Sequence, residues 1–448
     1  MKGLTIKRVF LPLAGCLIWG YVQAQDAAPQ SLTLTLEKAL EIALSDNPTI
    51  KVAGQEIELK REANREAYAG LFPEASLSGT YSRTLKKQTM VMDFGGTSTT
   101  IKMGSDNTYN GGISITLALF APALYKAISL TKTDVDLAVE KARSSKLDMI
   151  SQVTKAYYQV LLAQDSYDVL QKSYKQAEAN FEMIKTGFEQ GRVSEYDKIR
   201  ADVQVRNLKP TLVSVGNGLN LAELQLKVLI GVSADTKIAV EGNLKDYEMV
   251  MFQQELNDNK LSLTNNSDLK QLDLNATLLQ KSLKLQQTSF MPTLGVAFNY
   301  AYMTLNNNFK FSDYKWNPYS TLNFSLSVPL FKASNFTKVK QTRIQMRQLA
   351  ETRVNAERQL NMLATSYKNN MNAGCEQVLS NKEGILQAEK GREIAHKRYE
   401  VGKGTILELN DSEVALTQAQ LVYHQSIFDY LTAKADLDKV LGKENISE

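Results

Sequence analysis

The chain has 448 residues, which is longer than one compact core usually is, so two domains or an extended architecture are expected. Its 52 basic and 48 acidic residues leave a formal net charge of +4, and this balance gives no support to nucleic-acid binding. Of the two cysteines and two histidines, Cys16 lies in an N-terminal segment that resembles a cleaved leader. A mature chain therefore keeps three, fewer than the about four ligands close together that a structural zinc site needs. Neither a metal nor a cofactor is therefore expected.

Residues 1–24 have the pattern of a secretory signal peptide. Three basic residues precede or open a mostly apolar run over 9–22, and a small-x-small cleavage signal ends at Ala24, before Gln25. The tetrapeptide that ends at Cys16 also resembles a lipobox, an alternative in which this cysteine carries lipid; the apolar run continues past it, which favours cleavage instead. The pattern predicts an exported protein, and no later stretch reaches the ~18 apolar residues of a membrane-spanning helix.

Two constant offsets along the chain indicate an internal duplication. At an offset of 219 residues Asn47 matches Asn266, and at an offset of 211 residues the turn motif that ends at Gly191 matches the one that ends at Gly402. The sequence therefore predicts two similar halves. The predicted units are a signal peptide over 1–24, a first repeat over 25–231, a connector over 232–265, a second repeat over 266–442 and a C-terminal tail over 443–448.

Within the first repeat the hydrophobic period changes twice. Apolar residues recur at helical spacing up to Phe72, just before a proline. Around Leu77 apolar and polar residues then alternate, which predicts a strand. From Phe120 to Phe188 apolar residues recur at heptad spacing, which predicts a helix of about 100 Å. The predicted elements are a first helix, strands at about 74–86 and 108–119 around a polar loop over 86–107, a long helix over 122–187 and a return helix over 194–230.

The second repeat follows the same plan. Its strand segments, 293–303 and 317–331, contain no charged residue, in a chain that is 22% charged. Asn381 and Arg392 interrupt the heptad seam of its long helix. The predicted elements are a first helix, strands at about 293–303 and 318–330 around a polar loop over 304–316, a long helix over 333–399 and a return helix over 405–441.

Alternating, uncharged strands in an exported chain favour a membrane β-barrel over the alternative of a soluble β-layer. Four strands cannot close a barrel, and open strand edges are not tolerated in lipid, so several chains have to share one barrel. The heptad helices are too long to bury their seams alone and have to pack side by side. The fold class expected is α+β, with a long coiled-coil helical barrel joined to a shared transmembrane β-barrel.

The order and spacing of these features resemble the TolC family of outer-membrane efflux proteins, the outer membrane factors. The resemblance rests on the paired halves, the prolines Pro73 and Pro292 before the strands, and the turns Phe188–Gly191 and Tyr399–Gly402. It implies a homotrimer with a 12-stranded barrel in outer-membrane lipid, a helical tunnel across the periplasm of a Gram-negative cell, and an equatorial region built from the connector. It also implies a periplasmic adaptor and an inner-membrane pump of the RND or ABC type.

The resemblance also implies an acidic periplasmic aperture just beyond the turns. By this likeness Asp197, Glu408 and Asp411 ring the entrance, and Tyr399 matches a tyrosine of the closing network. An alternative role for each carboxylate is to favour the start of a helix electrostatically.

The turns themselves are the expected docking point for the adaptor, because they lie at the far end of the long helices. The family's model member has an arginine where Gly404 stands, which leaves Arg192 or Lys403 as the closing cation. The docking-turn residues are Gly191, Arg192, Gly402, Lys403 and Gly404.

Three functions are weighed. The first is an outer-membrane exit duct of a tripartite efflux or type I secretion system, a passive conduit across periplasm and outer membrane. The second is a secreted structural coiled-coil protein such as a filament or appendage subunit, which the duplication disfavours. The third is a periplasmic enzyme, which is disfavoured because the sequence contains no recognisable nucleophile–base pair. The first is preferred, and its cargo stays open.

Overall fold

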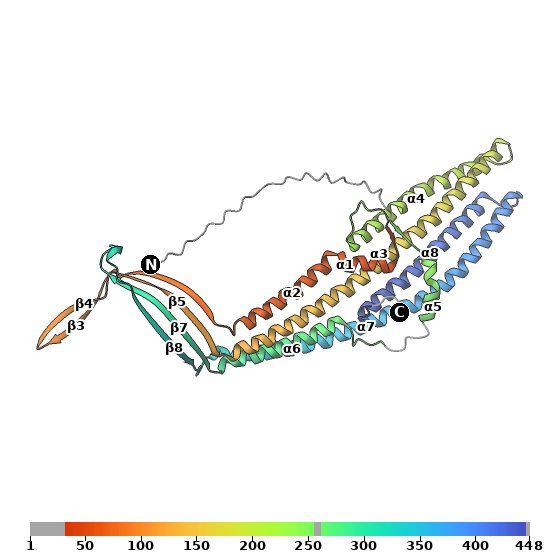
Figure 1. Ribbon diagram of the computed structural model, residues 1–448. Coiled ribbons are helices and arrows are strands. Elements are labelled where there is room, and N and C mark those ends of the chain that lie inside the picture. The colour runs from red at the N-terminus through yellow and green to blue at the C-terminus, as the bar shows by residue number, and fades with distance from the viewer. Residues whose placement is uncertain (1–31, 255–260, 445–448) are drawn as a thin grey trace, which may run out of the picture.

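The computed structural model describes residues 32–254 and 261–444. Long helices form one end of the elongated molecule and a sheet forms the other (Figure 1). The described chain is mostly helical with some strands, in line with the expected α+β character. Among the helices of these residues, none combines the length and the apolar character that crossing a membrane requires.

Two pairs of helices have matching lengths. α3 and α7 have 68 residues each, and α4 and α8 have 36 each. α3 and α4 form one antiparallel hairpin and α7 and α8 form the other, and each hairpin ends in a tight turn at the tip of the molecule (Figure 1). The helices are α1 Leu36–Asp46, α2 Pro48–Ala69, α3 Pro122–Glu189, α4 Glu195–Ile230, α5 Glu248–Gln254, α6 Ser267–Gln287, α7 Ala333–Glu400 and α8 Ile406–Leu441.

The first helix expected from the sequence is two helices, because α1 ends at Asp46 and α2 begins at Pro48. Pro48 has no backbone N–H with which to continue α1. The Asn47 side chain accepts a 2.7 Å hydrogen bond from the Thr49 N–H, which caps α2, and donates one of 2.7 Å to the carbonyl of Leu229. The break therefore anchors the start of the chain to the end of α4.

Four strands form one antiparallel sheet in the order β2-β5-β7-β8, so β5 and β7 join the two halves of the chain. β1 and β6 pair in parallel near the middle of the molecule. The strands are β1 Leu32–Leu34, β2 Glu74–Arg83, β3 Gln88–Phe94, β4 Thr97–Met103, β5 Asn107–Phe120, β6 Ile238–Val240, β7 Thr293–Asn306 and β8 Asn317–Ser327.

The segment over 86–107 is not only the polar loop that the sequence indicates. Most of it forms a separate hairpin, β3–β4, which extends beyond the four-stranded sheet (Figure 1). The hairpin turns at Gly95 and Gly96, both at positive φ, as two-residue hairpin loops require. Scattered threonines between Thr89 and Thr100 hide the alternation of this segment in the sequence.

The register of the four-stranded sheet separates apolar from polar side chains. Leu77 pairs with Ile113, which pairs with Tyr300, so all three lie on one face. Apolar residues of this face are largely exposed; Leu326, for example, is 68% exposed. The opposite face is polar, and the Ser114 hydroxyl donates a 2.7 Å hydrogen bond to the Asn299 side chain there. One face of the sheet thus suits lipid and the other suits water.

The main core lies at mid-length, where α3 passes the connector between the halves. Tyr157 of α3 is fully buried, and its hydroxyl donates a 2.6 Å hydrogen bond to the carbonyl of Glu241. Leu34, Leu226, Leu244 and Ile427 pack in the same core.

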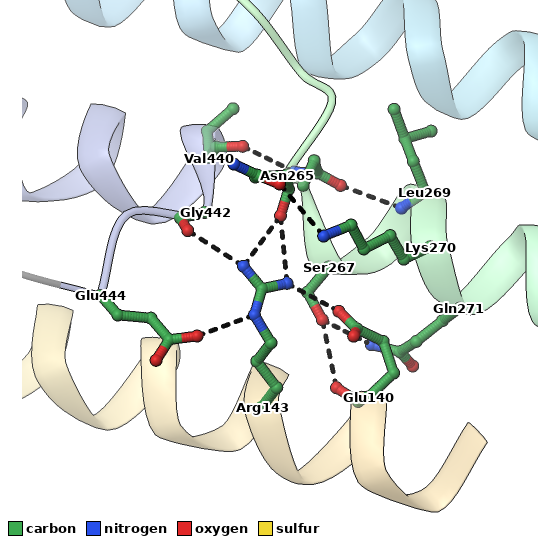
Figure 2. A network of polar contacts seen from close by, with 11 residues as sticks. Glu140, Arg143, Asn265, Ser267, Leu269, Lys270, Gln271, Val440, Gly442 and Glu444 are labelled. Atoms are coloured by element: carbon green, nitrogen blue, oxygen red, sulfur yellow. Dashed lines mark hydrogen bonds and ion pairs between the residues drawn. The ribbon is translucent and has the colours of Figure 1, made fainter. Parts of the chain in front are cut away.

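Arg143 of α3 holds the end of the second half in place (Figure 2). Its guanidinium donates to the carbonyls of Asn265 (3.1 Å) and Gly442 (3.0 Å), and to the Glu444 carboxylate (2.8 Å). The Glu140 carboxylate accepts a further 2.8 Å hydrogen bond. Five donors in a rigid fork suit such a junction, and the neighbouring carboxylates raise the pKa of Arg143 despite its partial burial.

Candidate functional site: the helical tip

The first tip turn reverses the chain between α3 and α4. Gly191 has φ +72°, a left-handed conformation that favours glycine, and its N–H donates to the carbonyl of Phe188 (2.8 Å). The N–H of Arg192 donates to the carbonyl of Gly187 (2.8 Å). Ser194 then caps α4 by accepting a hydrogen bond from the Asp197 N–H (3.2 Å).

The second turn repeats this geometry between α7 and α8. Gly402 has φ +71°, and its N–H donates to the carbonyl of Tyr399 (3.0 Å). The N–H of Lys403 donates to the carbonyl of Arg398 (2.8 Å), and Thr405 caps α8 by accepting from the Glu408 N–H (3.2 Å). Asp197 and Glu408 are thus equivalent residues in the first turns of α4 and α8, where negative charge is favourable.

A small hydrophobic cluster joins the two turns. Ile184 of α3, Ala201 of α4, and Ile406 and Leu409 of α8 are buried together, with Tyr399 of α7 packed against them. All four helices of the tip contribute to this cluster. The two hairpins are therefore held to each other at the tip by apolar contact.

The structure brings two of the sequence-predicted aperture residues together. Burial raises the pKa of Tyr399, and the negative charge of Asp197 raises it further. They come from different hairpins, Tyr399 from the end of α7 and Asp197 from the start of α4.

Glu408 has a cation beside it that the sequence did not indicate. The Arg398 guanidinium of α7 lies 3.6 Å from the Glu408 carboxylate and also donates a 3.2 Å hydrogen bond to the carbonyl of Lys403. Arg398 is not one of the two cations, Arg192 and Lys403, that the sequence suggested for a closing contact. Both partners are about half exposed, so the pair contributes at most about 1 kcal/mol to stability. Asp411 lies one turn further along α8 and is exposed.

Gly404 sits against the end of α7. A Cβ added to it would meet the backbone nitrogen of Tyr399 at 3.0 Å and the Arg398 backbone at 3.1 Å. A larger residue at 404 therefore requires a shift of the turn. Gly191 and Gly402 have open space around them, so only their backbone conformation restricts substitution.

The seam between α7 and α8 contains a charged pair a few helical turns away from the tip turn. Arg392 lies 3.9 Å from Glu413, and both the Arg392 Nε and a Glu413 carboxylate oxygen are buried without a hydrogen-bond partner. Burial raises the pKa of Glu413, while Arg392, His396 and a hydrogen bond from Asn180 lower it; the net direction is upward. The pair borders a groove of about 600 Å³ between α3, α7 and α8.

The seam interruption at Arg392 was the sequence signal for this pair, because a cation on an apolar seam needs an acidic partner. What the sequence did not identify was Glu413 as that partner. Among the residues that the structure describes, no three or more His, Cys, Asp or Glu side chains converge as metal ligands.

Comparison with known proteins identifies the family. The model for the outer membrane efflux protein family matches residues 39–232 and 260–443. The chain belongs to this family. Outer membrane protein TolC of Escherichia coli (strain K12) is 21% identical over 454 residues, which covers 98% of this chain and 87% of TolC. The cobalt-zinc-cadmium resistance protein CzcC of Cupriavidus metallidurans is 22% identical over 461 residues, covering 98% of this chain and 100% of CzcC.

Solved structures of channels have the same fold. The Campylobacter jejuni CmeC outer membrane channel aligns with a TM-score of 0.72 at 15% identity, covering 100% of this chain and 95% of CmeC. The resemblance to the TolC family is therefore confirmed. This efflux protein is an outer-membrane exit duct, and its helical part lies in the periplasm.

Proposed function

We propose that three copies of this efflux protein close their sheets into one 12-stranded barrel and pack their helices into a tunnel. The observation that carries the proposal is the four-stranded sheet with two free edges, β2 and β8, and one exposed apolar face. Unpaired strand edges are costly in lipid, and closure through neighbouring copies removes them. In this proposal the duct is a passive conduit across the periplasm and the outer membrane.

The matched hairpins support a duplicated origin of the chain. α4 ends at Gly231 with φ +79°, and α8 ends at Gly442 with φ +71°, so both return helices end in the same left-handed cap. Two equivalent hairpins per chain supply six to a trimer. Helices of this length, about 100 Å, would form the walls of the tunnel.

The tip is the proposed entrance and docking end. Asp197, Glu408 and Asp411 form the acidic aperture with Tyr399 as a closing contact, and the turns at Gly191 and Gly402 receive a periplasmic adaptor that links the duct to an inner-membrane pump. The support is the position of the α3–α4 and α7–α8 turns at the end of the molecule farthest from the sheet (Figure 1).

Native mass spectrometry of the protein in detergent tests the assembly, with three copies as the expected result. Planar-bilayer recording of the same preparation tests the conduit, with discrete ion-conducting steps expected. A monomer that forms no conducting steps would refute both the shared barrel and the duct.

A further inference from the structure

The end of the sheet farthest from the helices carries a folded aromatic cluster. The loop 307–316 between β7 and β8 folds back onto β5, where the Tyr109 ring lies 5.3 Å from Tyr314, 5.9 Å from Phe311 and 6.5 Å from Trp316. Tyr109 shares the apolar face of the sheet with Ile113, since the two are four residues apart on one strand. These four aromatic residues, here called the aromatic cap, therefore continue the apolar face.

Three cations surround the aromatic cap and are here called the basic rim: Arg83, Lys310 and Lys315. The Arg83 guanidinium lies 5.1 Å from the centre of the Phe309 ring, next to Lys310 in the chain. Lys315 stands between two residues of the cap. All three side chains are exposed.

The loop of the basic rim has one carboxylate, Asp313, which accepts a hydrogen bond from the Ser312 hydroxyl, so the net charge of the rim stays positive. Over 32–254 and 261–444, no carboxylate forms an ion pair with any of its three members. Their neighbour Lys87, by contrast, pairs with Asp106 at 3.3 Å. The strands below the rim contain almost no charge, so the positive charge is concentrated at this end of the sheet.

The position of the basic rim favours a lipid headgroup over a ligand inside the duct. On the opposite, polar face at the same height, Asn110 donates a 3.2 Å hydrogen bond to the Tyr319 hydroxyl, and these two residues satisfy each other. Tyrosine and tryptophan prefer the boundary between hydrocarbon and water, and a cation beside them can reach a phosphate at that level. Arginine in particular matches phosphate geometry through paired hydrogen bonds.

We propose that the basic rim and aromatic cap form a binding site for the phosphorylated glycolipid headgroups of the outer leaflet. The proposal rests on the shared barrel proposed above, in which the apolar face of the sheet meets lipid. In the site Arg83, Lys310 and Lys315 bind headgroup phosphate, and the cap packs against the sugar and the first part of the acyl chains. Three such sites in a trimer fix the height of the barrel in the membrane.

Trp316 provides a direct probe of this site. The chain has two tryptophans, and the other, Trp19, lies in the predicted signal peptide. Purified trimer in detergent is titrated with bisphosphorylated lipid A, and the emission of Trp316 is followed. A saturable blue shift is expected with lipid A, a weaker one with its monophosphorylated form, and none with phosphatidylcholine.

The decisive variant is Arg83→Gln with Lys310→Gln and Lys315→Gln. Loss of three cations near an anionic headgroup should weaken lipid A binding on the order of a hundredfold. The matched control removes the same charge from α2, by Lys51→Gln, Lys60→Gln and Arg61→Gln, and should bind as the parent does. Native mass spectrometry counts the lipid A molecules retained by each trimer and does not depend on fluorescence.

The possible results distinguish a failure of the proposed lipid site from a failure of the proposed trimer. Conducting trimers whose triple variant binds lipid A like the parent would overturn the site and leave the duct intact. Competition by free pyrophosphate that equals lipid A in affinity would also overturn it, since the rim would then be an anion site without lipid preference. Failure to form conducting trimers would count against the proposed assembly instead.

Discussion

The two helical hairpins of the molecule, α3–α4 and α7–α8, have equal lengths and similar tip turns but different seams. Along α3 the seam includes Phe181 and the buried Ile184, which pack with the tip cluster. The position in α7 that matches Phe181 at the 211-residue offset is Arg392, which faces Glu413 with buried atoms that lack partners. An apolar seam excludes water, whereas a poorly satisfied charged pair destabilises the helices that contain it.

The two hairpins also differ in the number of helices packed against them. α3 packs on α2, α4, α6 and α8, while α7 packs chiefly on α6 and α8. Because of its charged seam, the part of α7–α8 nearest the tip turn should separate from the rest of the tip more readily than α3–α4. The equal lengths of the hairpins thus conceal unequal stability, and the experiments below test that inequality.

The largest expected difference in stability is between alanine substitutions of the two glycines that end the return helices, Gly442 and Gly231. Gly442→Ala would place a Cβ 2.1 Å from the Asn265 carbonyl oxygen and should cost about 3 kcal/mol or more, because hydrogen bonds from Arg143 hold the backbone of both residues in place. Gly231→Ala meets its nearest atoms at 3.5 Å and should cost only about 1–2 kcal/mol for its left-handed backbone. Thermal dissociation of the purified trimer measures both. Equal decreases in the dissociation temperature of the two variants would show that the backbone around Gly442 relaxes and relieves the predicted clash.

The tip turns provide the next comparison. The side chains of Gly191→Trp and Gly402→Trp would meet open space, and their left-handed backbone should cost only about 1–2 kcal/mol, so trimers should still form. Transport should fall at least about tenfold, because the adaptor contact is lost. Dye efflux in intact cells measures transport, and membrane fractions report the trimer. Gly54→Trp on α2 is the control, since it also has open space and lies far from the tip. Unchanged efflux in both tip variants would exclude docking at these turns.

The aperture carboxylates are unequal between the hairpins. The second carries Glu408 and Asp411, whereas the matching positions of the first are Asp197 and Arg200, so negative charge is concentrated on α8. Glu408→Ala with Asp411→Ala should reduce block by di- and trivalent cations about tenfold, because acidic rings concentrate cations. Planar-bilayer conductance measures this block, and Glu58→Ala with Glu62→Ala on α2 is the control. Block that persists unchanged would locate the constriction elsewhere.

Much of the fold follows from patterns that a single sequence contains. Heptad spacing predicted the long helices, and alternation of apolar and polar residues predicted the four strands of the sheet, because burial faces repeat with the period of the element. The β3–β4 hairpin was missed, since its threonines fall on both apolar and polar positions and obscure the alternation. The helix break at Asn47 was also missed, although Pro48 was a signal for it.

The candidate site was less predictable because its partners come from separate segments. The position of Tyr399 near Asp197 depends on how α7 meets α4, which no local pattern specifies. Arg398 beside Glu408 depends on the angle of the turn at Gly402. Glu413 could be matched to Asp202 by the repeat offset, but its burial follows from packing against α3 and α7.

The smallest expected effect tests the charged seam through pH. A carboxyl whose folded-state pKa is raised contributes stability at pH values below its unfolded pKa, and this contribution is lost as pH rises through the folded pKa. Burial raises the pKa of Glu413, so α7–α8 should be more stable near pH 4 than near pH 7 by this group alone. Because Glu413 is only partly buried, the difference should be below about 1 kcal/mol.

Hydrogen exchange of α8 residues near Glu413, corrected for intrinsic rates, measures this difference at the two pH values. Glu413→Gln should abolish the pH dependence, because an amide does not titrate. The matched control in the first hairpin is Asp202→Asn, which removes one partner of an exposed pair with Arg206 and should change stability by no more than about 0.5 kcal/mol at either pH. If exchange at the start of α8 is no faster than at the start of α4 in the parent protein, the charged seam does not weaken the second hairpin, and the proposed inequality between the hairpins is wrong.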